Sequence, residues 1–258
     1  MNMERENAWN GYETEELKKV DALNQEYRTF LNEGKTEREC VKLAVKMAEE
    51  AGYRDLKEVI AKKETLKAGD KVYAVGMKKM ISLFQSGKKP LEEGMAILGA
   101  HIDSPRLDIK QNPLYEEGGF AYLDTHYYGG IKKYQWVTLP LAIHGVIAKK
   151  DGTIVPVSIG DEEEDPVFVI TDLLVHLASK QLEKKLIHLA GENMEKKANK
   201  VIEGEALDIL VGSRPLKGAE KEAVSKQILS ILKEKYDMEE EDFLSAELEV
   251  VPAGKSRE

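Results

Sequence analysis

Near the start of the chain, apolar residues recur three or four positions apart, a spacing that predicts two amphipathic helices. The first runs from about Thr14 to Gly34. The second follows Thr36-Glu37-Arg38-Glu39, a capping box in which the threonine side chain accepts a hydrogen bond from a first-turn amide and the last glutamate reaches back. The apolar stripe of this helix begins at Cys40, and Gly52 ends it. Both helices have the pattern of covers for a sheet.

Short apolar runs bounded by glycines predict strands after these helices, over Lys71–Val75, Met80–Phe84 and Met95–His101. The connections between the runs consist of ordinary turn residues, among them Gly76 and Gly94. A helical layer that is followed by strands is typical of the first part of an α/β domain.

The pattern changes after Lys110, where glycine pairs and tyrosines separate runs of strand-forming residues. Two apolar runs, Trp136–Ala148 and Thr153–Ile159, flank Asp151-Gly152, a dipeptide that predicts a hairpin with a type I′ turn. The remaining expected elements are helices over about Thr171–Lys184 and Glu220–Tyr236, and a final strand over Ala246–Val251.

Composition limits the classes of function. The chain has 258 residues, of which 33% are charged and 42% hydrophobic, as in a globular protein. Its formal net charge of −9 argues against a general affinity for nucleic acid. The single cysteine, Cys40, excludes an intrachain disulfide and fits a reducing compartment. No signal-peptide core or run of membrane-spanning length is present, so we expect a cytoplasmic protein with neither membrane nor nucleic acid as partner.

His101 and Asp103 stand at the end of the third predicted strand. Because side chains alternate along a strand, both should point to the same face. A carboxylate beside a metal-ligating imidazole orients the ring and fixes its tautomer, whereas the alternative interpretation is a histidine that packs at a strand end. The acidic runs Asp161–Pro166 and Glu239–Asp242 favour solvated loops over metal sites, because like charges repel and no histidine stands beside them.

These features together resemble the aspartyl-aminopeptidase family of dinuclear zinc metallopeptidases, in its bacterial form. The resemblance rests on Thr36–Val41, on Gly99–Arg106 (Gly-Ala-His-Ile-Asp-Ser-Pro-Arg), on Tyr127–Gly130 and on Pro252–Gly254, in the family's order. It implies an α/β fold in which a zinc-peptidase α/β/α domain is interrupted by an inserted β-rich dimerisation domain. Residues 1–110 would then be the first part of the peptidase domain, residues 111–242 the insert, and residues 243–258 the re-entry into the peptidase domain.

The resemblance also implies roles for single residues. His101 would be a zinc ligand, and Asp103 the neighbouring orienting residue of the catalytic centre. His176 resembles the family histidine that reaches across the dimer into the partner's substrate site, an interpretation that we weigh evenly against a histidine packed on an apolar helix face. His126, His144 and His188 are expected to be structural or surface residues.

The reaction that the resemblance implies is hydrolytic release of N-terminal amino acids from peptides, with two zinc ions and a glutamate base. In the family most zinc ligands and the base follow the strand that ends here near Gly254, and no such motif precedes Glu258. We therefore expect an N-terminal half, truncated and inactive alone, that forms a homo-oligomer through the insert. The alternatives are a non-catalytic dimerisation or interaction protein, and one half of a split enzyme.

Overall fold

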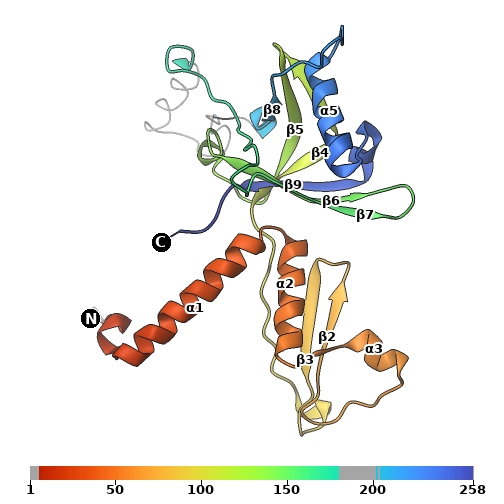
Figure 1. The fold of residues 1–258 in the computed structure, drawn as a ribbon. Helices are drawn as coiled ribbons and strands as arrows, with labels where there is room; N and C mark the ends of the chain where they lie inside the picture. Colours follow the sequence, from red (N-terminus) through yellow and green to blue (C-terminus); the bar gives the residue numbers. More distant parts are fainter. Residues whose placement is uncertain (1–5, 180–201, 203, 258) are drawn as a thin grey trace, which may run out of the picture. The chain divides into compact units, whose positions relative to one another are not determined.

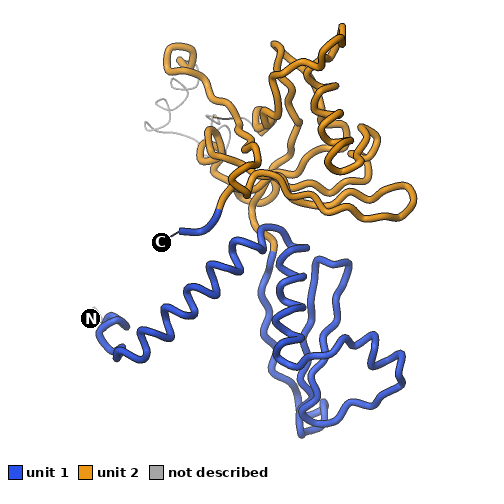
Figure 2. The backbone as a smooth tube through the Cα atoms, in the orientation of Figure 1, with its two compact units in different colours: residues 1–102, 255–258 blue, residues 103–254 orange. Residues whose placement is uncertain are grey.

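A computed structural model describes residues 6–179, 202 and 204–257 of the chain. The chain divides into two compact units, Met1–Ile102 with Lys255–Glu258, and Asp103–Gly254 (Figure 2). The architecture is mixed α/β with one sheet in each unit. None of the helices in the described part of the chain is long and apolar enough to cross a membrane.

The first unit contains the two helices that the sequence predicts. Its elements in chain order are η1 (Ala8–Gly11), α1 (Thr14–Glu33), α2 (Glu37–Glu50), β1 (Arg54–Asp55), α3 (Leu56–Ala61), β2 (Lys71–Gly76), β3 (Met80–Gln85) and η2 (Leu91–Glu93). The capping box at the start of α2 is formed, since the Glu39 amide donates to the Thr36 hydroxyl over 3.4 Å and the Thr36 amide donates to the Glu39 carboxylate over 3.0 Å.

The sheet of the first unit has the order β1-β2-β3, with β1 parallel and β3 antiparallel to β2. Helix α2 lies alongside the β2–β3 hairpin (Figure 1). The apolar side of α2 supplies Val41 and Ala48 to a small core that also contains Val59 and Val72. The predicted pattern of a helix covering strands is therefore confirmed for α2. It is not confirmed for α1, which packs against α2 and has no buried residue.

The prediction of a third strand over Met95–His101 is wrong. The segment is irregular, and it has no ladder partner among the described residues. Ile97 and Leu98 are 79% and 101% exposed. An apolar run indicates burial, but a strand also needs a neighbouring strand that accepts and donates its backbone hydrogen bonds, and no described strand does so for this run.

The second unit is built on six antiparallel strands in the order β7-β6-β9-β4-β5-β8. Helix α5 packs against β4, β5 and β8 (Figure 1). Leu107, Leu141, Ile147 and Val250 are fully buried in its core. The elements are β4 (Arg106–Glu117), β5 (Phe120–Tyr128), η3 (Lys133–Gln135), β6 (Leu141–Ala148), β7 (Ile154–Ile159), η4 (Gly204–Ala206), β8 (Ile209–Gly212), α5 (Ala223–Tyr236), η5 (Glu240–Ser245) and β9 (Ala246–Pro252).

The hairpin predicted around Asp151-Gly152 joins β6 to β7, but its turn differs from type I′. Gly152 has φ of +87°, whereas Asp151 does not have a positive φ. The Gly152 amide donates to the Lys149 carbonyl over 2.9 Å, and the Lys149 amide donates to the Thr153 carbonyl over 2.8 Å. A turn followed by a left-handed glycine is the three-residue hairpin loop with a glycine bulge.

The helix predicted over Thr171–Lys184 is absent from Thr171–Ala178, and residues 180–184 lie outside the described part. The preceding residues are held extended by bridges to the sheet, including Val169 to Leu210. A tight turn then follows, in which the Leu177 amide donates to the Leu174 carbonyl. The apolar spacing predicts a helical face, but these residues form a turn that follows the bridges to the sheet.

The compact units do not coincide with the segments 1–110, 111–242 and 243–258 that the family resemblance implies. Strand β4 crosses Lys110, and β9 pairs with β4 and β6 inside the second unit. The chain instead divides after Ile102 and after Gly254. The change in composition at Lys110 marks the middle of a long strand. The assignment of the two units to a peptidase domain and a dimerisation insert stays a prediction.

Candidate functional site

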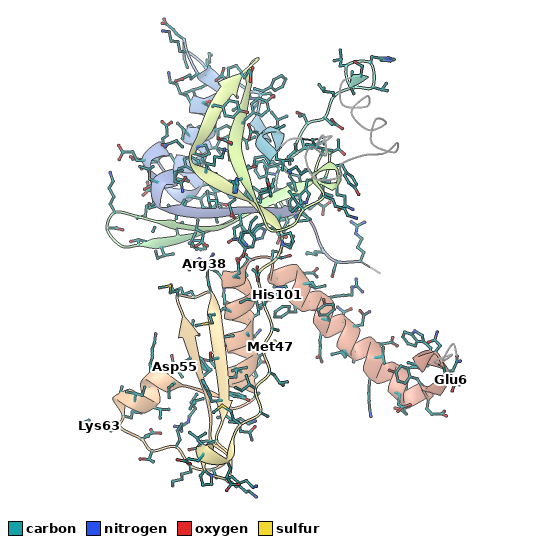
Figure 3. The ribbon with its side chains drawn as sticks, turned by 180° about the vertical axis from the view of Figure 1, so that it is seen from behind. Glu6, Arg38, Met47, Asp55, Lys63 and His101 are labelled. Atoms are coloured by element: carbon teal, nitrogen blue, oxygen red, sulfur yellow. The ribbon has the colours of Figure 1, made fainter. Side chains whose placement is uncertain are left out.

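The two residues of the predicted metal motif lie on either side of the division between the units. His101 is an exposed residue near the end of the first unit, and Asp103 is the half-buried first residue of the second. Figure 3 labels His101 in the irregular segment that follows η2. The alternation that would place both side chains on one face of a strand is therefore not formed.

Asp103 is positioned by the end of β5. Its Oδ2 accepts a hydrogen bond from the hydroxyl of Tyr128 over 2.9 Å. Tyr128 is the last residue of β5 and is paired across the ladder with Arg106, the first residue of β4. The antiparallel pairing of β4 with β5 thus brings the tyrosine back beside the residues that directly follow the His-x-Asp motif.

Arg106 fixes the ring of this tyrosine from the buried side. Its guanidinium carbon lies 4.2 Å from the ring centroid of Tyr128, within the range of a cation–π interaction. The Arg106 Nε donates to Asp108 over 2.8 Å and lies 3.2 Å from Oε2 of Glu249 on β9. Glu249 is only 2% exposed, so the guanidinium compensates a buried carboxylate.

Sequence reasoning did not find the roles of Tyr128, Arg106 and Glu249. The first two belong to strings that carried the family resemblance, but no contact was assigned to them. Glu249 alternates with apolar residues in β9 and has the pattern of a solvent-facing position. The sequence held no signal for its burial, which depends on the guanidinium of Arg106 from the neighbouring strand β4.

His176 lies in the turn that follows Thr171, and it is exposed. The interpretation of a histidine packed on an apolar helix face is therefore wrong. Its apolar neighbours are exposed as well, since Leu174 and Leu177 are 71% and 67% exposed. A role of His176 at a partner's substrate site stays a prediction.

The other histidines in the described part have structural positions. His144 is buried on β6, and its Nε2 lies 3.1 Å from Oδ2 of Asp161. His126 stacks on Tyr127 with ring centroids 5.3 Å apart. His188 lies outside the described residues.

The acidic runs are less solvated than expected. Asp161 pairs with His144, and Asp165 accepts from the Gly160 amide over 3.0 Å and lies 3.3 Å from Lys235. These contacts hold the pKa of Asp165 below its usual value, mainly through the hydrogen bond from the Gly160 amide. The contacts of Asp161 and Asp165 therefore attach this loop to β6 and α5 within the second unit.

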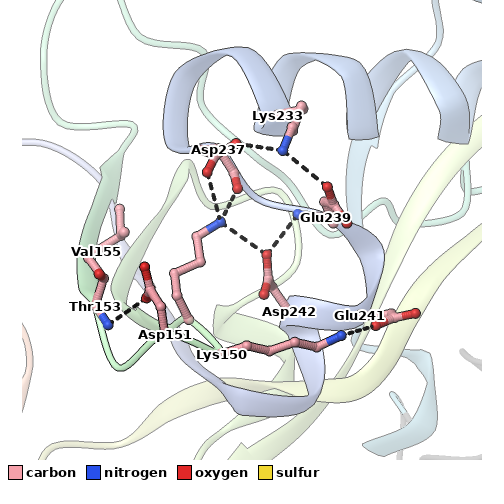
Figure 4. Close-up of a pocket in the computed structure, with 10 residues that line it drawn as sticks. Lys150, Asp151, Thr153, Val155, Lys233, Asp237, Glu239, Glu241 and Asp242 are labelled. Atoms are coloured by element: carbon pink, nitrogen blue, oxygen red, sulfur yellow. Dashed lines mark hydrogen bonds and ion pairs between the residues drawn. The ribbon is translucent and has the colours of Figure 1, made fainter.

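A pocket of about 340 Å³ lies where the β6–β7 hairpin meets α5 and η5 (Figure 4). Lys149 reaches into it and makes contact with Asp242 over 3.1 Å and with the Asp237 carbonyl. Asp242 is buried and also accepts from the Glu239 amide over 2.9 Å, which together with Lys149 lowers its pKa. The acidic run Glu239–Asp242 thus forms ion pairs that attach the hairpin.

A complete zinc site does not fit the described residues. Within residues 6–179, 202 and 204–257 no group of three or more His, Cys, Asp or Glu side chains is placed to hold a metal ion. A catalytic zinc ion needs about three protein ligands and one open position. Among the described residues, His101 is the one candidate ligand that the resemblance gives for such a site.

The sequence model of one family, described as aminopeptidase I zinc metalloprotease (M18), matches residues 30–258. The chain belongs to this family. The match contains the His101-x-Asp103 string and the strands that position Asp103, and the predicted relationship to the zinc aminopeptidases is confirmed. Zinc is the metal that the family description names.

Matches to several M18 relatives cover nearly the whole of this chain. A probable M18 family aminopeptidase 1 of Clostridium acetobutylicum is 60% identical over 256 residues, which are 99% of this chain and 52% of the relative. The crystal structure of aminopeptidase I from that organism matches with a TM-score of 0.82 at 58% identity, over 100% of this chain and 54% of that one. The M18 aminopeptidase structure from Thermotoga maritima matches with a TM-score of 0.82 at 42% identity, over 97% of this chain and 51% of that one.

The chain therefore spans about half the length of the M18 relatives that it matches. A more distant structure, the mApe1 dodecamer of S. cerevesiae, shares the fold with a TM-score of 0.61 at 16% identity. The expectation that the chain is a truncated product stays a prediction.

Proposed function

We propose that this chain acts in zinc-dependent aminopeptidase chemistry, with His101 as one metal ligand and Asp103 as the carboxylate that orients it. The observation that carries the proposal is the family match over residues 30–258, which includes both residues. The substrate class is a peptide with a free N-terminus, from which the family's reaction releases the first amino acid.

In this chemistry, residues of the second unit would hold the carboxylate of Asp103 in one orientation. The hydrogen bond from Tyr128 to Asp103 restrains the carboxylate, and Arg106 restrains the tyrosine ring. A carboxylate with a fixed rotamer holds an imidazole in one tautomer at little further entropic cost. The described residues do not form a full metal site.

We further propose that the 258-residue polypeptide alone lacks peptidase activity and does not bind two zinc ions. The support is the absence of a three-ligand group from the described residues. Purified chain should show no zinc-dependent release of N-terminal amino acids, and fewer than two zinc ions per chain by metal analysis. Metal-dependent turnover by a preparation free of contaminating peptidases would contradict this.

A complementation assay tests the role of His101 itself. The chain is mixed with the part of the Clostridium acetobutylicum relative that it does not match, and aminopeptidase activity is measured with zinc. We expect activity that His101→Ala abolishes and that the control His126→Ala preserves, because His126 only stacks on Tyr127. Equal activity of both variants would refute the ligand assignment.

The second candidate function is a non-catalytic oligomerisation protein, and the exposed apolar turn around Leu174 and His176 is the observation that favours it. We propose that the β-rich second unit forms a homo-oligomer through this turn. Analytical ultracentrifugation should show an assembly that Leu174→Asp dissociates and that the control Leu244→Asp, at another exposed leucine of the unit, leaves intact. A monomeric wild-type chain at high concentration would contradict the assembly.

We assign the protein to the cytoplasm. The support is its single cysteine, which is buried in the first unit, and its bacterial relatives. Fractionation of the native host, with detection by an antibody against this chain, tests the assignment. Recovery of the protein outside the cytoplasmic fraction would contradict it.

A further inference from the structure

Strand β3 lies at the edge of the first unit's sheet, but its sequence has the pattern of an interior strand. Its residues, Met80–Gln85, include neither a charged residue nor a proline. Leu83 and Phe84 are neighbours in the strand, so their side chains point to opposite faces of the sheet, and both are exposed. Edge strands of soluble proteins normally carry charges, prolines or bulges that prevent pairing with another chain. Apolar residues on both faces are typical of a strand that is covered on both sides.

A second apolar segment of the same unit follows β3. None of residues 95–100 is charged, and Met95, Ile97 and Leu98 are all exposed, Leu98 fully. The backbone of this segment is irregular and pairs with no described strand, although its sequence favours a strand. Contiguous apolar residues that remain exposed indicate an interaction surface.

The buried core of the first unit is small for the length of the unit. Its buried apolar side chains among the described residues are Cys40, Val41, Ala48, Val59, Val72 and Tyr73. Helix α1 adds none, and its exposed Leu23 and Tyr27 line a groove of about 660 Å³ between α1 and α2. The main hydrophobic cluster of the described residues lies in the second unit, from Leu107 to Val250. A unit of this length normally buries a larger share of its apolar surface.

We propose that the outer edge of β3 and the segment Met95–His101 form a docking surface for the part of an M18 aminopeptidase that this chain does not match. The partner adds strands to the first unit's sheet. Its identity is supported by length, because the M18 relatives that match nearly all of this chain contain about as much polypeptide again. An uncharged strand edge offers backbone hydrogen bonds to an added strand, and the apolar side chains beside the edge are covered by the same partner.

The choice of partner rests on the proposed function, and docking has a consequence for the metal motif. His101 is the last residue of the docking segment and has an irregular backbone in the free chain. Pairing of Met95–His101 as a strand fixes the backbone that carries this imidazole. A metal ligand needs such a rigid support, because small displacements of a ligand weaken the site.

Co-expression tests the docking surface without requiring either polypeptide to fold first. The chain carries a purification tag and is produced together with the part of the Clostridium acetobutylicum relative that it does not match. We expect the two polypeptides to co-purify as one complex. Amide hydrogen exchange should show protection of β3 and of Met95–His101 rising about tenfold or more over the free chain, while the interior strand β6 keeps its protection. Failure to co-purify would overturn the proposal, and so would a complex in which these amides gain no protection.

The variant Leu98→Asp tests the contribution of the docking segment. Leu98 is fully exposed in the free chain, so the substitution leaves the fold of the chain unchanged but places a carboxylate in the apolar contact of the complex. We expect the dissociation constant of the complex to rise at least about tenfold. The control Ile60→Asp adds the same charge at an exposed residue of α3, which packs against β1 and β2, and should bind like the wild type. Equal effects of the two variants would overturn the proposal.

Binding is measured without zinc or peptide, which separates docking from peptidase activity. A complex with the expected protection that shows no activity after zinc is added supports the docking surface and contradicts the proposed peptidase function. Loss of binding in Leu98→Asp alone supports docking whether or not the complex is active. A free chain that dimerises with β3 protected, and that excludes the partner, would identify a second copy as the occupant and overturn the proposal.

Discussion

Tyr128 donates its hydroxyl to Oδ2 of Asp103 over 2.9 Å, and this bond ties the His-x-Asp segment to the end of β5. The tyrosine is in turn fixed by Arg106, which stacks over its ring and contacts the buried Glu249. A line of contacts thus leads from the buried ladder between β4 and β9 to the carboxylate of the family motif. The orientation of Asp103 is a property of the second unit's sheet.

The substitution Tyr128→Phe removes the hydroxyl and keeps the ring beneath Arg106. We expect a loss of about 1 kcal/mol in the free energy of unfolding of the second unit, because one partly exposed hydrogen bond is lost. Urea unfolding can be followed by the fluorescence of the buried Trp136 in a Trp9→Phe background. The control Tyr134→Phe removes the hydroxyl of an exposed tyrosine and should have no effect. Equal losses in both variants would show that the bond to Asp103 contributes nothing.

The substitution Arg106→Met should be far more damaging. It leaves the carboxylate of Glu249 buried without its guanidinium, and breaking such a pair costs about 3–5 kcal/mol. The same Trp136 fluorescence assay measures the loss. A double variant with Glu249→Gln should recover part of the stability, since the uncompensated charge is then absent. If Glu249→Gln in the Arg106→Met background recovers nothing, the cost does not come from the buried charge.

Local patterns in the sequence were sufficient where neighbours along the chain determine the structure. The capping box at Thr36 and Glu39 and the left-handed Gly52 place both ends of α2, because their contacts are with residues three or four positions away. The β6–β7 hairpin was predicted for the same reason. Its turn type was not, since Asp-Gly is compatible with both the type I′ turn and the turn with a glycine bulge.

Long-range pairing could not be read in this way. The apolar pattern of Met95–His101 predicted a strand, although strand formation depends on a partner that the run does not specify. Glu249 has the spacing of a surface residue and is buried because Arg106, far away in the sequence, neutralises it. Asp103 likewise acquires its partner Tyr128 only through the register of β4 with β5.

Two consecutive lysines in the β6–β7 turn offer a matched comparison. Lys149 is largely buried between Asp242 and Asp237, whereas Lys150 is exposed and pairs with the exposed Glu241. We expect Lys149→Met to lower the free energy of unfolding of the second unit by about 2 kcal/mol, because Asp242 loses a charge-assisted bond. Lys150→Met should leave it unchanged, because exposed ion pairs contribute little. The reverse order in the urea experiment would contradict the proposed attachment of the hairpin.

Tyr73 provides a pH-dependent prediction in the first unit. Its hydroxyl donates to Oε1 of Glu49 over 2.8 Å, and this bond, with burial and the carboxylate charge, raises the pKa of the phenol from 10.0 to about 12. Because the folded pKa lies above the unfolded one, the contribution of this bond to stability is complete below about pH 10 and is lost as the pH rises through the folded value. An ultraviolet titration of the phenolate should therefore show a tyrosine that ionises near pH 12, separate from Tyr115, whose pKa is also raised.

The assignment of this late transition rests on two variants. Tyr73→Phe should abolish it, whereas Glu49→Gln should move it toward the ordinary tyrosine pKa, because the acceptor charge is removed while a hydrogen-bond acceptor remains. The control Tyr27→Phe, at an exposed tyrosine of α1, should leave the late transition in place. A transition near pH 12 that persists in Tyr73→Phe would place this raised pKa on another residue and would exclude the link between α2 and β2 as its cause.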